Sequence, residues 1–265
     1  MTLKSLNFIL IAAMSLFCLA CSGTKDKPAP EPVFYKTMTE LMTDKAAGQI
    51  GHGGEKLKDG YSGQGVLLFA DQSRYVGRFR QGNYDGEGFF IFGPDQPGGY
   101  EDAWRQSGNR YEGGFKNSQY HGKGVFVFAE GARYEGDFVH NQFQGQGILT
   151  QADGGRYEGR FKSGRFHGRG VYLSTQGDRY EGSFIDGRYE GKGIFVSAQG
   201  ARYEGDFSNN MFNGKGTYTF PDGSRYEGGF ANNLPEGRGT YVTAKGDSYE
   251  GLFRQGRLLG KWGRK

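Results

Sequence analysis

The sequence has few of the residues that carry redox, metal or covalent chemistry. Its 265 residues include two cysteines, Cys18 and Cys21, and four histidines. If a leader is cleaved before Cys21 and Cys21 is acylated, the mature chain has no free thiol, which excludes a disulfide framework, a thiolate metal site and a cysteine nucleophile. No nucleophile elbow, phosphate-binding loop or metal motif is found. We therefore expect no enzymatic activity, no metal and no cofactor.

A strong excess of one charge is missing as well. The formal net charge is +4, and removal of residues 1–20 takes away only Lys4, which leaves +3. Nucleic-acid binders carry a larger and more clustered basic excess. The sequence therefore predicts no nucleic-acid partner.

A run of residues that could stay in a membrane as a helix is missing too. The segment from Leu6 to Ala20 is nearly all apolar, with Asn7 and Ser15 as polar exceptions. It is too short for a typical transmembrane helix. A basic start followed by a short apolar stretch is typical of a secretory signal, so we predict that residues 1–20 are a signal peptide.

Residues 16–23 resemble a bacterial lipoprotein signal, in which cleavage occurs before a cysteine that follows a small residue. Ala20 and Cys21 match this pattern, whereas Cys18 stands where leucine is preferred. The resemblance implies a lipid on Cys21 and a location at the periplasmic face of a bacterial outer membrane. The alternative is an ordinary cleaved signal and a periplasmic or secreted protein.

The segment after the signal has two predicted parts. Residues 21–33 contain three prolines and predict a flexible tether. Within residues 34–51, apolar residues fall at helical spacing and predict a short helix near 36–47, which would cap the first repeats and cover a sheet edge. These apolar residues are Phe34, Met38, Leu41 and Met42.

Glycine and aromatic residues, in contrast, are abundant: the chain has 49 Gly, 17 Tyr and 22 Phe. The segment Tyr-Glu-Gly-x-Phe begins at Tyr111 and returns every 23 residues up to Tyr249, and a Tyr-Val-Gly-x-Phe form begins at Tyr75. A fixed period of this kind marks a repeat array. One repeat alone cannot bury enough apolar surface to fold, so neighbouring repeats must stack. We place the array at residues 52–265.

The pattern within one period, numbered from its tyrosine, predicts two strands. Positions one, three and five alternate with polar residues, so Tyr, Gly and Phe share one face. Positions seven and eight carry turn residues such as Asp186-Gly187, which suit a tight hairpin. Positions fifteen to seventeen form a second strand, and a second turn closes the period. We expect glycines at positions twelve and fourteen to let the strand bend and neighbouring aromatic rings lie against bare backbone.

One repeat is interrupted. The distance from Tyr75 to Tyr111 is 36 residues, which is 13 more than the period. The excess falls in residues 93–108, an inserted loop that contains Tyr100 and Trp104. We predict that these two side chains form an interaction loop.

The whole pattern, Tyr-x-Gly-x-Phe followed by an aromatic residue at position ten and glycines at twelve and fourteen, resembles the MORN repeat, the "membrane occupation and recognition nexus". The resemblance covers residues 52–265 in about eight to nine copies. It implies an all-β fold, an elongated, twisted, single-layer antiparallel meander of β-hairpins, here with the short N-terminal helix added. MORN proteins serve as interaction scaffolds, dimerisation modules and proposed phospholipid binders.

Two rows of basic residues recur on the period. One row is the arginine before each tyrosine, which we expect the glutamate at position two to neutralise across the sheet. The other row lies at position thirteen and either binds anionic lipid or another anionic polymer or is neutralised in the same way. Its members are Lys123, Arg169, Lys192, Lys215, Arg238 and Lys261.

Aromatic side chains either form the core of the array or line a groove for an extended peptide or glycan. His121 and His167 both occupy position eleven, two repeats apart. In one sheet they would be about 19 Å apart, so we predict two surface histidines and no shared metal.

These patterns predict a non-enzymatic, membrane-tethered repeat scaffold that binds a protein partner or itself. The alternative is a module that binds anionic phospholipid or polysaccharide through the basic rows.

Overall fold

The structure, a computed structural model, describes residues 50–51, 60–69, 72–93 and 108–264. The predicted signal peptide, tether and capping helix, together with Tyr100 and Trp104 of the inserted loop, lie outside the described residues. In the part of the chain that is described, no helix is long and apolar enough to cross a bilayer. The chain divides into two compact units between Gly154 and Gly155. We call their described parts the N-terminal array (residues 50–154) and the C-terminal array (residues 155–264).

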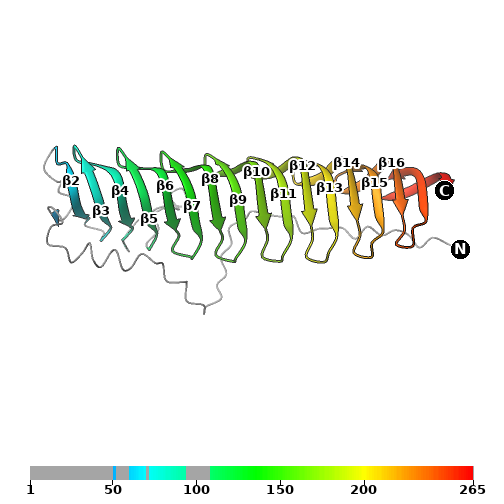
Figure 1. Cartoon of the computed structure of the whole chain (residues 1–265), viewed down its shortest axis with the longest axis horizontal. Helices are drawn as coiled ribbons and strands as arrows, with labels where there is room; N and C mark the ends of the chain where they lie inside the picture. Colours follow the sequence, from blue (N-terminus) through cyan, green and yellow to red (C-terminus); the bar gives the residue numbers. More distant parts are fainter. Residues whose placement is uncertain (1–49, 52–59, 70–71, 94–107, 265) are drawn as a thin grey trace. The chain divides into compact units, whose positions relative to one another are not determined.

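The N-terminal array is a sheet in which consecutive strands from β2 to β8 pair antiparallel, while the short β1 pairs parallel with β2. Figure 1 shows these strands side by side in chain order. Their bounds are β1 Ile50–Gly51, β2 Gly63–Leu68, β3 Arg74–Arg80, β4 Asn83–Ile91, β5 Arg110–Lys116, β6 Gln119–Val127, β7 Arg133–Val139 and β8 Gln142–Thr150.

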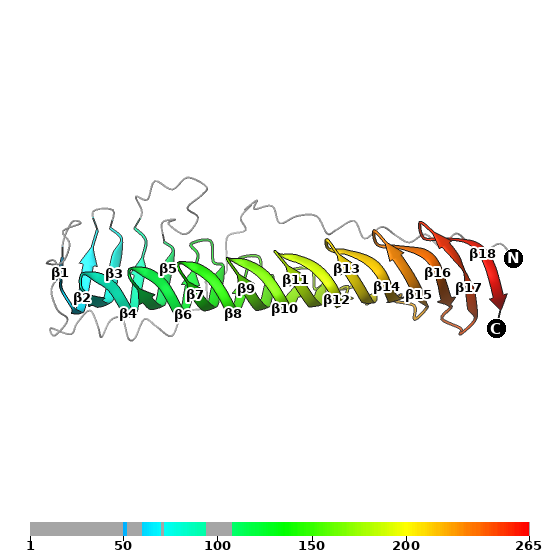
Figure 2. The ribbon, with the colours of Figure 1, turned by 90° about the horizontal axis from the view of Figure 1, so that it is seen from above.

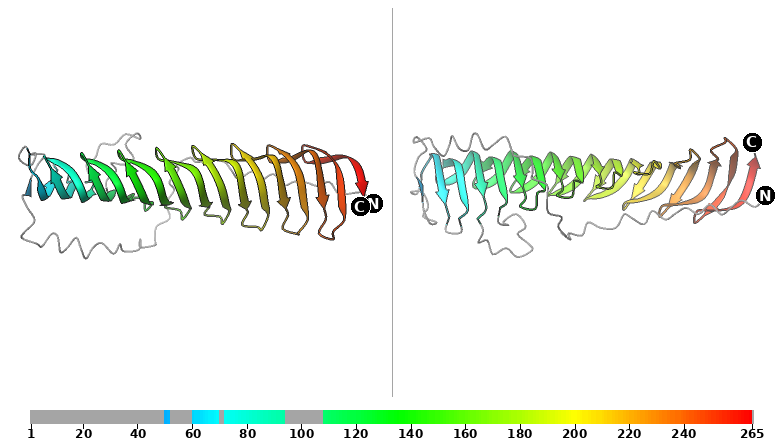
Figure 3. Two further views of the ribbon diagram at one scale, coloured as in Figure 1. Left: turned by 45° about the horizontal axis from the view of Figure 1, so that its top comes forward. Right: turned by 90° about the horizontal axis from the view of Figure 1, so that it is seen from below.

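The C-terminal array repeats the arrangement, with each strand from β9 to β18 antiparallel to the next. Figures 2 and 3 show its strands, coloured from green to red, as one layer from several sides. The bounds are β9 Arg156–Lys162, β10 Arg165–Leu173, β11 Arg179–Ile185, β12 Arg188–Val196, β13 Arg202–Ser208, β14 Met211–Thr219, β15 Arg225–Ala231, β16 Leu234–Val242, β17 Ser248–Arg254 and β18 Arg257–Arg264. The predicted antiparallel meander of hairpins is therefore confirmed in each array.

Two kinds of turn join the strands, as the pattern predicts. The first is tight, with positive φ at both central residues, for example 48° at Asp186 and 83° at Gly187. This geometry matches the right-handed twist of the flanking strands. The second turn is wider, and around Asp222 it closes with the Phe220 N–H donating to the Ser224 carbonyl at 2.8 Å. The inserted loop takes the place of such a second turn, because Ile91 of β4 still pairs with Arg110 of β5.

The core of each array is the ladder of aromatic rings. Tyr180, at position one, is fully buried. It stacks on Tyr189 at 3.7 Å between ring centroids and meets the edges of Phe184 at 5.1 Å and Phe207 at 4.9 Å. Its hydroxyl donates to the Ser183 carbonyl at 2.9 Å. Equivalent contacts recur along both arrays, so these aromatic side chains are core rather than the lining of an open groove.

Glycines make room for these rings. A Cβ on Gly193, at position fourteen, would lie 2.6 Å from the Tyr180 ring. The prediction that aromatic rings lie against bare backbone therefore holds, but the tyrosine belongs to the same repeat rather than to a neighbour. At position twelve the glycine has positive φ, for example 69° at Gly191. The strand register shifts close to it, between Gly182 and Ser183 of the paired strand, so the strand bends there.

Candidate functional site

A groove crosses the C-terminal array from β10 to β17 on the face opposite to the aromatic core. Its volume is about 1500 Å³. Its floor is backbone, formed by the glycines of positions three and fourteen, which pair directly across the strands, as Gly193 does with Gly205 and Gly216 with Gly228. Eight strands at about 4.8 Å spacing make a groove about 34 Å long.

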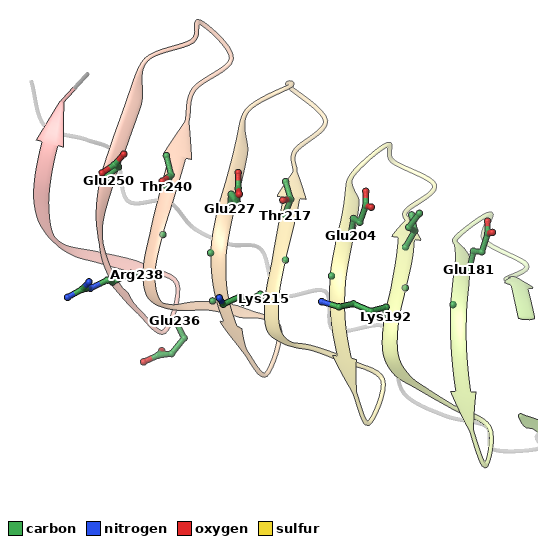
Figure 4. A pocket seen from close by; sticks show the side chains of 18 of the residues that line it. Glu181, Lys192, Glu204, Lys215, Thr217, Glu227, Glu236, Arg238, Thr240 and Glu250 are labelled. Carbon is green, nitrogen blue, oxygen red and sulfur yellow. The ribbon is translucent and has the colours of Figure 1, made fainter. Parts of the chain in front are cut away.

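One wall of the groove consists of glutamates at position two that alternate with smaller residues at position fifteen. Strand register places Glu204 between Ile194 and Thr217, and places Glu227 between Thr217 and Thr240. Figure 4 shows the glutamates and the two threonines on one side of the glycines. We call this the acidic wall, and its glutamates are Glu181, Glu204, Glu227 and Glu250.

The opposite wall consists of the basic residues of position thirteen, together with Glu236 at position eleven. Lys192, Lys215 and Arg238 lie on the other side of the glycines in Figure 4, and Arg169 continues the row. We call this the basic wall. The structure thus brings together four of the six residues that the sequence predicted as a basic row, and it places an acidic residue across the floor from each.

The other two predicted residues lie elsewhere. Lys123 is in β6 of the N-terminal array, where its Nζ contacts Asp137 at 2.7 Å. Lys261 is in β18, with its backbone opposite Gly251, and its side chain is outside the described part of the structure. Neither residue lines the groove.

Ion pairs neutralise part of the arginine row, but not across the sheet as the sequence predicted. Arg179 pairs with Glu181 and Arg202 with Glu204, at 2.5 and 2.6 Å. Each pair lies along one strand, two residues apart, because residues i and i+2 share a face. The neighbouring strands instead present apolar or hydroxyl residues to Glu204, so the predicted cross-strand pairing is wrong.

Where position four of the next strand is acidic, it neutralises the cation at position thirteen. Lys192 contacts Asp206 at 2.6 Å, and the Lys192 ammonium holds the pKa of Asp206 below its ordinary value. The cross-strand neighbour of Arg169 is Ser183, and that of Lys215 is Gly229. This difference follows from position four, the most variable place in the Tyr-Glu-Gly-x-Phe segment.

The half of the groove over β14 to β17 therefore differs from the half over β10 to β13. Among the described residues, Glu181 and Glu204 of the acidic wall have arginine partners, while no ion pair is found for Glu227, Glu250 or Lys215. At Glu250 the reason is local, since Ser248 replaces the arginine two residues earlier. Charges of both signs are thus exposed to a ligand across the same floor.

The histidines differ from the prediction in exposure. His121 and His167 are both half-buried rather than on the surface. The His121 ring lies 6.2 Å from that of His140 in the N-terminal array. In the C-terminal array, Nδ1 of His167 is buried and has no hydrogen-bond partner among the described residues.

In the N-terminal array the face that corresponds to the groove has a different character. Glu87 and Gln146 stand at position thirteen, where Lys123 and the repeats of the C-terminal array have a cation, and Phe89 at position fifteen pairs with Glu112. Burial, together with the Glu87 charge, raises the pKa of Glu112 to about 7. The basic wall therefore belongs to the C-terminal array.

The acidic wall was missed as part of a site, because the glutamate at position two appeared only as the partner of arginine. The signal that could have revealed it is strand alternation, which places positions two, thirteen and fifteen on one face, away from the rings. Position fifteen also changes from Val171 and Ile194 to Thr217 and Thr240 toward the C-terminus, which makes that half of the groove more polar.

Fold and groove define the chain as a β-hairpin repeat protein. A family model of the MORN repeat matches eight segments, and the chain belongs to this family. The matched segments are residues 57–74, 75–94, 111–133, 134–156, 157–179, 180–202, 203–225 and 226–248. No curated protein matches the chain.

Several solved structures are similar in fold. The wild-type TCP10 domain of CPAP from Danio rerio has 12% identity and a TM-score of 0.40, with 75% of this chain and 88% of that chain covered. The same domain in complex with a peptide of Danio rerio STIL has 13% identity and a TM-score of 0.39, with 78% and 97% covered. The G-box domain of the microcephaly protein CPAP has 11% identity and a TM-score of 0.39, with 72% and 100% covered. A likeness at this identity concerns the fold alone.

Proposed function

We propose that this protein is a non-enzymatic, membrane-tethered scaffold whose repeat array binds another protein through the groove of the C-terminal array. The observation that carries the proposal is that the acidic and basic walls face each other across one backbone floor.

A surface of mixed charge suits a protein partner. Protein surfaces carry both signs, and complementary charge placement gives protein interfaces their specificity and register. An anionic membrane attracts clusters of cations, whereas here each basic residue of the groove has a glutamate across the floor. Part of the arginine row beside the groove is neutralised as well, at Arg179 and Arg202.

The alternative is a module that binds anionic phospholipid or polysaccharide through the basic wall. It is favoured by Arg169 and Lys215, for which no ion pair is found among the described residues. Charge reversal separates the two candidates. A lipid module loses vesicle binding when Lys192, Lys215 and Arg238 are changed to glutamate, and its binding falls steeply with salt.

The test uses the full chain, with vesicles of neutral lipid containing or lacking an anionic lipid. We expect the unlipidated protein to show no more binding to anionic than to neutral vesicles. Cross-linking capture in the native envelope should instead recover a defined protein, and the double variant Glu227→Gln with Glu250→Gln should abolish its recovery. For the triple charge reversal in the vesicle assay, Lys123→Glu is the matched control, because it changes the same repeat position outside the groove. Salt-sensitive vesicle binding that the triple variant loses would replace the proposal with its alternative.

The tether and the location are part of the proposal. They are supported by the apolar segment 6–20 and by the Ala20-Cys21 pair. Mass spectrometry of the mature N-terminus should find a diacylated or triacylated cysteine at Cys21. Cys21→Ser should remove the protein from outer-membrane fractions, and an unmodified N-terminus at another residue would contradict the tether.

Self-association is the second form of the binding role. Light scattering of the purified protein over a range of concentrations distinguishes it from binding to another protein. If the mass stays at that of a monomer at every concentration, which is 29.3 kDa for the full sequence less the removed signal, the groove binds a different protein.

A further inference from the structure

We propose that the groove binds a polypeptide segment in the polyproline II conformation, with a basic side chain at every third residue. The inference deepens the proposed function and rests on it, because it names the chemistry of the partner that the groove accepts.

The first argument is the spacing of the acidic wall. Successive glutamates lie two strands apart, which is about 9.6 Å at about 4.8 Å per strand. A polyproline II helix has three residues per turn and a rise of about 3.1 Å, so its side chains return to one face every ~9.3 Å. From Glu181 to Glu250 the mismatch accumulates to only about 1 Å.

Other conformations do not match this spacing. A β-strand places side chains on one face every two residues, or about 6.7 Å. An α-helix returns to nearly the same face after seven residues, or about 10.5 Å, and it would be out of step by nearly 3 Å over the same distance. The repeat length of the array thus selects the left-handed extended helix.

The second argument is charge. Glu227 and Glu250 stand at the spacing of one helical turn and have no ion pair among the described residues. Lysine or arginine side chains three residues apart on the ligand would reach both. On the other wall the Lys215 ammonium faces the ligand's carbonyl groups, which accept hydrogen bonds because a polyproline II chain has no internal ones.

The third argument concerns the floor. Its backbone groups are already engaged in the antiparallel ladder, as in the pairs of Gly216 with Gly228 and Gly239 with Gly251. A ligand N–H directed at this floor would find no acceptor and would remain costly to desolvate. Proline has no backbone N–H, so a proline-rich segment avoids this penalty, whereas a segment that adds a strand to a sheet would not.

The experiment measures binding of four labelled peptides to the full chain by fluorescence anisotropy at physiological salt. The matched peptide is (Lys-Pro-Pro)4. The charge control is (Glu-Pro-Pro)4, the flexibility control is (Lys-Gly-Gly)4, and the spacing control is (Lys-Pro)6, which has more lysines at the wrong interval. We expect the matched peptide to bind at least tenfold more tightly than each control. Equal binding of the flexible peptide, or tighter binding of the spacing control, would overturn the inference, because binding would then follow charge alone.

Substitutions locate the binding. The double variant Glu227→Gln with Glu250→Gln should weaken binding of (Lys-Pro-Pro)4 at least tenfold. The matched double control, Glu135→Gln with Glu158→Gln, changes the same repeat position outside the groove and should keep binding within twofold. Equal loss in both doubles would refute a site in the groove.

The partner-capture experiment separates the two proposals. If Glu227→Gln with Glu250→Gln abolishes capture of a native partner while no (Lys-Pro-Pro)4 binding is seen, the scaffold function stands and the polyproline inference is wrong. If (Lys-Pro-Pro)4 binds as expected while the tethered protein captures no protein, the ligand chemistry stands and the scaffold function is wrong.

Discussion

Replacement of Gly193 by alanine should destabilise the C-terminal array through a single contact. The new Cβ would lie 2.6 Å from Cε2 and from the hydroxyl of Tyr180, and 2.8 Å from its Cζ. Real Cβ contacts are rarely closer than about 3.4 Å, so the ring would have to move by nearly 1 Å. The ring cannot do so easily, because it is stacked on Tyr189 at 3.7 Å and wedged between Phe184 and Phe207.

The expected cost follows from the cost of overpacking. Inserting a methyl group into a well-packed core costs about 1–3 kcal/mol, and the rigidity of this ring places Gly193→Ala near the upper end. Alanine also reduces the freedom of the unfolded chain, which returns about 0.4–1 kcal/mol. We therefore expect the free energy of unfolding to fall by about 2 kcal/mol.

The assay is urea denaturation of the full chain followed by circular dichroism. Hydrogen exchange on peptides from β11 and β12 is measured in parallel, because a repeat array can open locally. Gly260→Ala is the control, since a Cβ there meets no atom within 4 Å. That variant should change stability by less than about 0.5 kcal/mol.

A double-mutant cycle tests the cause of the destabilisation. In a Tyr180→Ala background the methyl group at position 193 has no ring to displace, so Gly193→Ala should then cost almost nothing. Coupling of about 2 kcal/mol between the two sites is expected. If the effects of the two changes are additive, the loss of stability comes from the backbone rather than from the ring. The explanation that Gly193 makes room for the Tyr180 ring is then wrong.

Three further outcomes follow from the contacts described above. Tyr180→Phe removes the 2.9 Å hydrogen bond to the carbonyl three residues along and should cost about 1 kcal/mol in urea denaturation; no loss would show that water replaces the bond. Arg202→Ala breaks a solvent-exposed pair with Glu204 and should lower the free energy of unfolding by less than about 1 kcal/mol. This cost should be smaller still at high salt, and a larger loss that does not depend on salt would contradict the expectation. Burial and the Glu87 charge raise the pKa of Glu112 to about 7 in the folded protein, so its contribution is fully present below about pH 4.5 and is lost as the pH rises through 7. Since Glu112 is partly exposed, stability should fall by about 1–2 kcal/mol over that range, and Glu112→Gln should remove this fall; an unchanged pH profile in the variant would assign the effect to another group.

The repeat itself could be predicted because its information is local. The spacing of Tyr111 and its successors, the turn pair Asp186-Gly187 and the alternation of Tyr, Gly and Phe each act within one strand or one turn. Such features depend on backbone sterics and side-chain alternation, which are properties of a short segment. The turns of both arrays accordingly appear where the pattern predicted them, while the second strand of a repeat is longer than predicted, since β12 begins at Arg188, position nine.

The position-thirteen row could be predicted only in part. The sequence showed that Lys192 and Lys215 are equivalent in the repeat, but their partners come from the next strand, where Asp206 stands opposite one and Gly229 opposite the other. Which cation is neutralised therefore depends on strand register. The pairing of Arg202 with Glu204 along one strand, rather than across two, also required the geometry of the side chains.

The sequence alone thus determined the period, the strand content, the turns and the residue types that each face presents, since these are set by neighbours along the chain. The tertiary structure decided which side of the sheet is open. The tyrosine rings fill one face of the glycine row, so the other face is left as a bare backbone floor between the acidic and basic walls. The physical reason is that a glycine has no side chain whose size or polarity predicts burial. Only the packing of the sheet shows whether the space beside the glycine holds a ring or remains a groove.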